Sequence, residues 1–536
     1  MKLNVESLKN NKSQWEQKGF ELPQFDIESV RAQTAKTPEW VHFGAGNIFR
    51  GYIACLADEL IKNGEMSTGI IAADTFDTEM LDRIYPPFDD LALLVGLRAQ
   101  GDKYLRVIAG ISDSVGASGE GLEKLKTIAK ADSLKMISFT ITEKGYATRS
   151  MSGEVFGYVQ QDIDNGPDGS LNSAMSVIAA MMLGRFEAGA KPIALVSMDN
   201  CSRNGEKLRE GVMFVAEQWR EKGFVSDEFI AYLSDSSRVS FPWSMIDKIT
   251  PRPDDSITKE LADMGIEDMQ PIITAKKTFI APFVNAEMPQ YLVIEDSFPN
   301  GRPPLEKAGV YMTDRETVDR AEKMKVMTCL NPLHTALAVF GCLLGFDKIS
   351  AEMNDPDLKD LVYKLGYVEG LPVVIDPVII RPEAFLREVL EQRLPNPYLP
   401  DTPQRIATDT SQKLAIRFGE TIKAYEQKND TAKLELIPLV IAAWIRYLTG
   451  ISDSGEPMEL SPDPMLEELS KTVDASWFGK TADRKAVESI LGNTSLFGSD
   501  LVKAGLSDKI CAYLDNMLSG SGAVRKTLTE ALAKVK

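Results

Sequence analysis

Residues 39–51 read EWVHFGAGNIFRG, and this stretch decides the fold of the first half of the chain. The apolar run 40–43 predicts a short buried strand, and the glycines after it predict a tight turn. Apolar residues at helical spacing over 52–61 then predict a helix. A second apolar strand, 69–73, ends in Asp74. This order of strand, glycine turn, helix, strand and acid is typical of a dinucleotide-binding unit.

The glycine turn supplies the first candidate cofactor residues. Backbone amides at a glycine turn and a helix N-terminus bind a pyrophosphate, and the candidates here are Gly44, Gly46, Asn47, Ile48 and Phe49. Two glycines fit the G-x-G-x-x-G fingerprint, while its third position is Phe49 and a glycine follows two residues later. A plain strand–turn–helix connection without a ligand is the alternative interpretation.

Asp74 indicates which dinucleotide is expected. A carboxylate at the end of the second strand accepts hydrogen bonds from the adenosine ribose hydroxyls and repels a 2′-phosphate, so it favours NAD over NADP. His42 lies inside the first predicted strand, and we expect it to be a packed core histidine rather than a catalytic residue.

Strand-like runs continue at 91–97, 104–111, 135–142 and 192–197, as expected of an α/β unit. Loops at the carboxyl ends of parallel strands form the ligand face of such sheets. The loop after the run 135–142 contains Glu143 and Lys144, which we include among the cofactor-binding candidates. The second reads SMDNCSRNG, in which Asn200 is placed to donate an amide hydrogen bond; a turn followed by a helix cap explains the same residues equally well.

A second stretch, KVMTCLNPLHTALAV at 325–339, places Lys325, Asn331 and His334 within ten residues of each other in a mostly apolar segment. Asn331 precedes Pro332, and this pair predicts a helix start. The helix is expected to run toward Gly341 with His334 in its first turn. Either these polar groups form a site, or this is a capped core helix with one hydrogen-bonded histidine.

Composition narrows the function classes. Acidic residues outnumber basic ones by 78 to 60, and the net charge of −18 argues against a nucleic-acid-binding surface. Five scattered cysteines and two histidines predict a reduced protein without a zinc site. The polar start does not have the pattern of a signal peptide, and the longest apolar runs are short for a membrane span. We therefore expect a cytoplasmic protein with neither membrane nor nucleic-acid partners.

The fold class predicted is α/β, with a Rossmann-type dinucleotide-binding domain at 1–300, including a polar lead-in, and a mostly α-helical domain at 301–536. Helix formers dominate after residue 314. In this second half, Arg405 and Lys413 are eight residues apart and share a helix face, where two cations suit a carboxylate or polyhydroxy substrate. A solvated face paired with nearby acids is the alternative. Asp247, between apolar residues, is either a paired structural acid or a hydroxyl acceptor.

Several motifs, in the same order, resemble the polyol-specific long-chain dehydrogenases, the family that includes mannitol dehydrogenase, fructuronate reductase and tagaturonate reductase. They cover about residues 39–420 and read GAGNIFRG, TEKGY, SMDNCSRNG, FPWSMIDKITP, PQYLVIEDSFPNGRPPLEKAGV, the Asn331/His334 stretch and RIATDTSQK. The resemblance implies a Rossmann-type domain followed by a helical one, NAD as cofactor and catalysis without a metal.

The resemblance also implies roles for individual residues. Lys325 corresponds to the general acid/base, Asn331 and Asn200 to the donors of an oxyanion hole, and His334 to the residue that orients substrate hydroxyls. Asp247, Arg405 and Lys413 correspond to positions that hold the substrate.

One spacing departs from the family pattern. Four residues usually separate the lysine from the asparagine, whereas five separate Lys325 from Asn331, and the usual spacing falls on Val326. On a regular helix one extra residue turns a side chain by about 100°. We therefore expect a π-bulge or kink between Lys325 and Pro332, since a π-bulge absorbs one inserted residue. Lys144 is the next candidate if Lys325 lies in solvent.

The expected function is NAD-dependent interconversion of D-fructuronate and D-mannonate. Cations at 405 and 413 suit a substrate carboxylate, and the NPLHTALAVFG segment resembles the uronate reductases. Tagaturonate reductase and mannitol 2-dehydrogenase are the alternatives within the family. An inactive nucleotide-binding protein is the alternative from another class.

Overall fold

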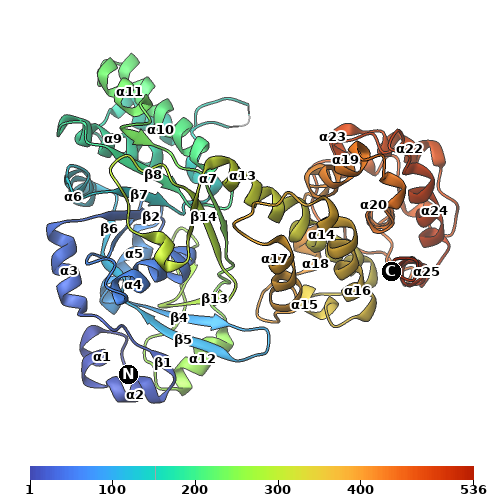
Figure 1. Ribbon diagram of the computed structural model, residues 1–536, viewed down its shortest axis with the longest axis horizontal. Coiled ribbons are helices and arrows are strands. Elements are labelled where there is room, and N and C mark those ends of the chain that lie inside the picture. Colours follow the sequence, from blue (N-terminus) through green and yellow to red (C-terminus); the bar gives the residue numbers. More distant parts are fainter. Residues whose placement is uncertain (151) are drawn as a thin grey trace. The chain divides into compact units, whose positions relative to one another are not determined.

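The computed structural model describes residues 1–150 and 152–536, and these form two compact units, Met1–Asp319 and Arg320–Lys536. Figure 1 colours the first unit from blue to yellow-green and the second from yellow to red. The first unit contains every sheet of the described residues, whereas the second is helical. Each unit is described by itself below.

Six parallel strands form the main sheet of the first unit (Figure 1). In spatial order they are β6 (Ile111–Gly116), β3 (Ile70–Asp74), β2 (Trp40–Phe43), β7 (Met136–Phe139), β8 (Ile193–Ser197) and β9 (Val239–Ser240). Numbered along the chain, this is the 3-2-1-4-5-6 order of a Rossmann sheet. The four central strands are buried at every position, which explains why they read as apolar runs rather than as alternating patterns.

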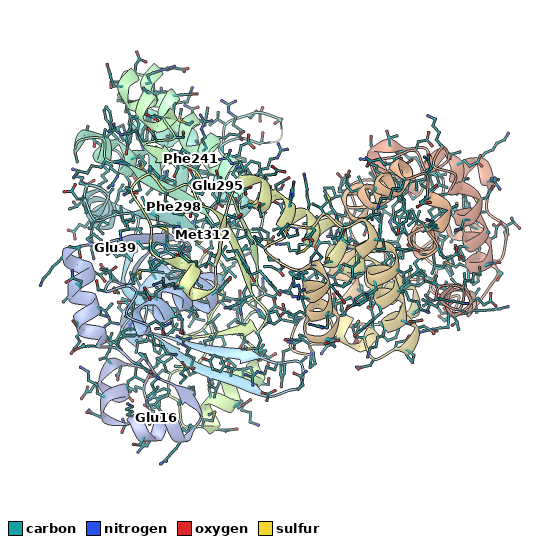
Figure 2. The ribbon with its side chains drawn as sticks, viewed as in Figure 1. Glu16, Glu39, Phe241, Glu295, Phe298 and Met312 are labelled. Atoms are coloured by element: carbon teal, nitrogen blue, oxygen red, sulfur yellow. The ribbon has the colours of Figure 1, made fainter. Side chains whose placement is uncertain are left out.

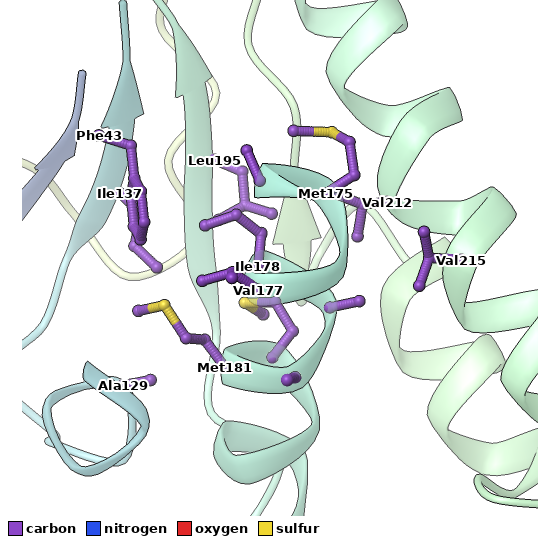
Figure 3. Packing of buried hydrophobic residues seen from close by; sticks show 14 of the residues in the cluster. Phe43, Ala129, Ile137, Met175, Val177, Ile178, Met181, Leu195, Val212 and Val215 are labelled. Carbon is purple, nitrogen blue, oxygen red and sulfur yellow. The ribbon is translucent and has the colours of Figure 1, made fainter. Parts of the chain in front are cut away.

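Alternate strand residues pack against helices on the two faces of this sheet. One face, with Phe43, Ile137 and Leu195, packs against α6 (Gly119–Ala129), α9 (Ala174–Glu187) and α10 (Asn204–Glu221). In Figure 3 the side chains of α9 lie between those sheet residues and Val212 of α10. Each such fully buried aliphatic side chain contributes about 1.5–3 kcal/mol of transfer free energy. Both sides of helix α9 are covered, one by the sheet and one by α10, and this explains why the helix is apolar nearly all round.

The other face packs against α4 (Ala54–Lys62) and α5 (Thr78–Ile84). Phe298 and Met312, labelled in Figure 2, pack against this second cluster from the segment around β15. That segment stays with the first unit because β15 (Tyr311–Thr313) pairs with β14 (Tyr291–Glu295), which also pairs with β10 (Ser244–Asp247).

The runs 91–97 and 104–111 form strands outside the main sheet. They are β4 (Ala92–Leu97) and β5 (Lys103–Ile108), an antiparallel pair in the four-stranded sheet β1-β5-β4-β13. The remaining elements of this unit are β1 (Phe20–Glu21), β11 (Ile272–Ile273), β12 (Phe279–Ile280), β13 (Phe283–Glu287), α1 (Val5–Asn10), α2 (Lys12–Gln17), α3 (Ile27–Lys36), α7 (Thr142–Tyr146), α8 (Gly157–Asn165), α11 (Asp227–Ser234), α12 (Asp255–Asp263), the π-helix η1 (Phe49–Ile53) and the short helices η2 (Pro86–Phe88) and η3 (Leu305–Ala308).

The second unit is built around α14 (Asn331–Leu344) and α20 (Leu436–Tyr447), which pack against each other. All of α20 is buried, as its sequence LIPLVIAAWIRY predicts for a central helix. Helix α14 does not end near Gly341 as predicted; it runs to Leu344 and ends at Gly345, whose φ of 79° suits a helix C-terminus. Gly341 lies inside the helix, and the close approach of Glu352 requires a glycine there, because a Cβ would lie 2.1 Å from Glu352 Oε1.

The other elements of the second unit surround these two helices. They are η4 (Met324–Cys329), α15 (Ile349–Glu352), α16 (Pro356–Lys364), η5 (Leu365–Gly370), η6 (Leu371–Val373), α17 (Pro382–Glu388), η7 (Val389–Arg393), α18 (Pro403–Ala407), η8 (Thr410–Gln412), η9 (Ala415–Gly419), α19 (Glu420–Gln427), η10 (Thr431–Lys433), α21 (Leu466–Leu469), η11 (Ala475–Trp477), α22 (Arg484–Leu491), α23 (Thr494–Phe497), α24 (Ser507–Leu518) and α25 (Ala523–Leu532). Helix α13 (Arg315–Lys323) leads into η4.

One helical run among the described residues, Arg315–Leu344, is long and apolar enough to cross a bilayer by length and composition alone. Its apolar window is 72% buried within the protein, which is the property of a core helix rather than of a lipid-facing one.

Candidate active site

The glycine turn after β2 uses its glycines for different purposes. Gly44 has a φ of 100°, and a Cβ there would lie 2.1 Å from the Thr140 carbonyl oxygen, so only glycine fits. Beside Gly46, by contrast, a Cβ would meet no atom of the described residues within 4 Å. Gly51 packs its helix closely against Thr250 and Val284, with 3.0 and 3.1 Å from its ideal Cβ to their methyl groups. The packing role of the third fingerprint glycine thus belongs to Gly51.

The helix that begins at Asn47 continues through the π-helix η1 into α4. Arg50 is buried and donates to the Asn47 side-chain oxygen at 2.9 Å and to the Ala281 carbonyl at 2.7 Å. This guanidinium fixes the first turn of the helix, on which Asn47 and Ile48 are only half-buried. Phe49 turns inward and stacks on the His42 ring with 4.5 Å between centroids.

His42 is a core histidine, as predicted. Its Nδ1 lies 2.6 Å from the Ser138 hydroxyl and its Nε2 lies 2.8 Å from the Thr140 hydroxyl. Burial lowers its pKa to about 3, so the ring is neutral.

Asp74 holds the turn together through backbone amides. Its Oδ2 accepts from the Ala45 amide at 3.2 Å, and its Oδ1 accepts from the amides of Phe76 and Asp77 at 2.7 and 2.9 Å. The carboxylate is therefore fixed at the carboxyl end of β3, directly beside the glycine turn. Open space at Gly46, a helix N-terminus and a fixed acid together fit the pyrophosphate and ribose of a dinucleotide.

The loops after β7 and β8 are tied together by Asp199. Its carboxylate accepts from the Ile141 amide at 2.8 Å, from the Thr142 amide at 3.0 Å and from the Tyr146 hydroxyl at 2.5 Å. Burial raises the pKa of Asp199. Asp199 thus determines where α7 begins, and so where Glu143 lies.

The predicted residues on these loops face solvent. Glu143 and Lys144 are exposed on α7, and Glu143 forms an ion pair with Lys207. Asn200 is exposed on the loop after β8. The helix cap that this motif allows is not formed, because α10 begins at Asn204 without a side-chain cap hydrogen bond; Asn204 instead donates to the Ser244 hydroxyl at 2.9 Å.

Asp247 is the last residue of β10 and is 7% exposed. It lies in register with Tyr291 on β14. Burial first, and then the negative charge of Asp247, raise the pKa of Tyr52, which places Asp247 near the helix that follows the glycine turn.

Lys325 lies in the π-helix η4. The predicted bulge is therefore confirmed: the helix is π-helical over Met324–Cys329 and then breaks at Leu330, whose φ and ψ are −131° and −63°. Lys325 is 3% exposed rather than in solvent. The extra residue in its spacing is absorbed by the wider helix.

Asn331 and His334 occupy the first turn of α14. Asn331 makes no side-chain cap hydrogen bond. Its amide therefore does not cap the start of the helix, contrary to the prediction. The half-buried His334 has its Nε2 3.4 Å from Asp401 Oδ2, and this nitrogen has no hydrogen-bond partner among the residues that the structure describes. Burial, followed by the positive charges of Arg417 and three other cations, lowers the His334 pKa to about 3. It is therefore a neutral ring with an unpaired buried nitrogen, and so suited to a ligand hydroxyl.

Arg405 and Lys413 do not share a helix face as predicted, because α18 ends at Ala407 and Asp409, with a φ of 54°, interrupts the chain before Lys413. Both still lie near His334, since the positive charge of each helps to lower the His334 pKa. Arg405 forms an ion pair with Asp401. Lys413 donates to the Thr408 and Ile406 carbonyls, the second at 3.4 Å. The alternative interpretation, in which these cations pair with nearby acids, therefore holds in part, because it describes Arg405.

Two further cations, Arg393 and Arg417, complete the group around His334 and were not predicted. Arg417 lies four residues after Lys413, at the spacing of one helical turn, and this interval is the signal that could have identified it. Arg393 is buried at the end of η7 and has no comparable signal in the sequence. Within the described residues, no group of three or more His, Cys, Asp or Glu side chains could hold a metal.

Comparison with known proteins gives the family. The model of the mannitol dehydrogenase Rossmann domain matches residues 38–307, and that of the mannitol dehydrogenase C-terminal domain matches residues 317–518. The chain belongs to the mannitol dehydrogenase family. The predicted family and the predicted fold class, a Rossmann-type domain followed by a helical one, are both confirmed.

Two relatives cover all or most of the chain. The D-mannonate oxidoreductase of Thermotoga maritima is 50% identical over 543 aligned residues, which cover 100% of this chain and 99% of that protein. The mannitol 2-dehydrogenase of Neosartorya fischeri is 28% identical, covering 89% of this chain and 93% of that protein.

Two solved structures share this architecture. D-sorbitol dehydrogenase in substrate-free form has a TM-score of 0.78 and 25% identity, covering 96% of this chain and 97% of that one. Pseudomonas fluorescens mannitol 2-dehydrogenase in a ternary complex with NAD and D-mannitol has a TM-score of 0.70 and 26% identity over 100% of both chains.

Proposed function

We propose that this protein is an NAD-dependent oxidoreductase that interconverts D-fructuronate and D-mannonate. The observation that carries the proposal is 50% identity, over the full length of both chains, to a D-mannonate oxidoreductase. The group of cations around His334 supports an anionic rather than a neutral substrate. A cytoplasmic location, where sugar acids are metabolised with NAD, is part of this proposal.

The first unit would bind the cofactor. The amides of the glycine turn around Gly46 and the helix N-terminus at Asn47 would hold the pyrophosphate, and Asp74 would accept from the adenosine ribose. Glu143 and Lys144 are proposed to contact the cofactor from the carboxyl edge of the sheet. Bound NADH supplies the hydride in reduction, and NAD accepts it in oxidation.

The protein's own residues would manage the proton and the carbonyl oxygen. Lys325 gives a proton to the substrate oxygen in reduction and takes it back in oxidation. The amides of Asn331 and Asn200 donate hydrogen bonds that stabilise negative charge on that oxygen. His334 cannot act as the acid near neutral pH because its pKa is about 3; it binds substrate hydroxyls as a neutral ring. Asp247, Arg405 and Lys413 are proposed to hold the rest of the substrate.

The test is NADH oxidation with D-fructuronate, D-tagaturonate and D-fructose, measured side by side. We expect D-fructuronate to give the highest kcat/KM. Preference for D-tagaturonate would make the protein a tagaturonate reductase, and preference for D-fructose would make it a mannitol 2-dehydrogenase, the activity named for the relatives at 28–29% identity. Absence of turnover with all three, together with NADH binding, would indicate an inactive nucleotide-binding protein.

A further inference from the structure

Of the four cations near His334, Arg417 makes the least complete set of hydrogen bonds and ion pairs within the protein. It lies in the π-helix η9 (Ala415–Gly419), and its Nη1 donates to the Thr335 hydroxyl at 2.5 Å. That hydroxyl donates in turn to the Asn331 carbonyl at 3.0 Å. Arg417 is thereby held against the first turn of α14, which carries Asn331 and His334.

The other cations near His334 are already engaged within the protein. Arg405 is paired with Asp401, Lys413 donates to two backbone carbonyls, and Arg393 has its own partner. For Arg417, among the described residues, the Thr335 hydroxyl is the hydrogen-bond partner and no acidic side chain lies within ion-pair distance. Burial lowers the pKa of Arg417 to about 10.

A half-buried guanidinium without a counter-ion is costly unless a ligand supplies the charge. Its planar arrangement of five N–H donors matches a carboxylate in two parallel hydrogen bonds. A neutral polyol presents hydroxyls but no such anion.

We infer that Arg417 binds the carboxylate of the substrate and so selects a sugar acid over the corresponding neutral sugar. Arg405 and Lys413, placed by resemblance on the substrate, are left to contact its hydroxyls. This inference rests on the proposed function, because only a sugar-acid substrate carries the carboxylate.

The experiment compares the Arg417→Met and Arg417→Lys variants with wild type. We expect Arg417→Met to lower kcat/KM for D-fructuronate on the order of 100-fold, mainly through KM, because a desolvated charge pair is lost. Turnover of D-fructose and the KM for NADH should change less than about threefold. Arg417→Lys should recover part of the loss, since it keeps the charge but not the paired hydrogen bonds. Arg484→Met, which removes an exposed arginine on α22, is the matched control and should leave both substrates unaffected.

A second readout does not require turnover of a neutral sugar. D-Gluconate should inhibit the wild type more strongly than D-sorbitol, and Arg417→Met or Arg417→Lys should reduce that preference. Equal losses with charged and neutral ligands, or an unchanged preference, would overturn the inference. A wild type inactive on D-fructuronate would instead overturn the proposed function. Should Arg417→Met fail to fold, as judged by its melting temperature, the lysine variant decides.

Discussion

At the scale of single residues, the two histidines behave alike, because burial is the main cause that lowers the pKa of both rings. His42 is hydrogen-bonded on both ring nitrogens inside the main sheet, and His334 is surrounded by cations in the second unit. Both have a pKa lowered to about 3. Near neutral pH neither carries a proton to donate as an imidazolium, which is consistent with our proposal that Lys325 is the general acid.

The pH profile of kcat/KM for the wild type should therefore show no change caused by the titration of a histidine. We expect no inflection in kcat/KM near pH 6.5, the range of an ordinary histidine, between pH 5 and 8. His334→Asn should lower kcat/KM about 10- to 100-fold through the lost hydroxyl contact, without changing the shape of the profile. The measurement is kcat/KM for D-fructuronate across that range. An inflection near 6.5 that disappears in His334→Asn would show that His334 titrates during the reaction.

At the scale of secondary structure, we propose that the π-helix η4 determines which residue acts as the proton donor. The family spacing falls on Val326, but the wider helix takes up the additional residue and Lys325 is buried. Neighbouring positions on a helix differ by about 100° in direction, so Lys325 and Val326 cannot exchange roles.

The double variant Lys325→Val/Val326→Lys tests this directly. We expect it to be as inactive as Lys325→Ala, with kcat lowered about 10²- to 10⁴-fold and NADH binding retained. Lys348→Ala, which removes an exposed lysine of the same unit, is the control and should keep full activity. Activity of the double variant well above that of Lys325→Ala would place the catalytic lysine at 326 and contradict the role of the π-helix.

The glycine turn offers a matched pair of variants. Gly44→Ala places a methyl group against the Thr140 carbonyl at a φ of 100°, and we expect it to lower the melting temperature or prevent folding. Gly46→Ala has open space in the protein, so it should fold normally and lose NADH affinity at least tenfold, because the methyl group would occupy the space required by the pyrophosphate. Thermal melting and NADH titration separate the two effects. Normal NADH affinity in Gly46→Ala would contradict this placement of the cofactor.

At the scale of the whole molecule, stability depends on a buried acid that the proposed chemistry does not use. Glu352 is fully buried beside Gly341, and neither of its side-chain oxygens has a hydrogen-bond partner in the structure as described. Burial raises its pKa to about 9. Because the folded state holds this proton more tightly than the unfolded state, stability is fully present below about pH 4.3 and falls as the pH rises toward 9.

Glu352→Gln removes this dependence. We expect the variant to be more stable than wild type at pH 7, on the order of 2 kcal/mol, and the difference to shrink toward pH 5. Melting temperatures from pH 5 to 8 measure the change, with the exposed Glu468→Gln as the control. A difference that does not vary with pH would mean that Glu352 is ionised in the folded protein.

The sequence determined those features that depend on neighbouring residues. Apolar runs, a glycine turn and an acid at fixed intervals specified the first βαβ segment, because strand burial and turn geometry are local properties. The additional residue after Lys325 specified the π-helix, because helix geometry permits few ways to absorb it.

Only the tertiary structure decided which distant groups meet. Arg417 and Thr335 are 82 residues apart, and packing brings the guanidinium to α14. Asp74 accepts from three backbone amides, and Gly341 lies inside a helix against Glu352. These outcomes depend on burial and on the charges of neighbouring elements, and the local sequence pattern encodes neither of them. The sequence therefore specified the segments that carry the candidate site, whereas folding set the charge environment around it.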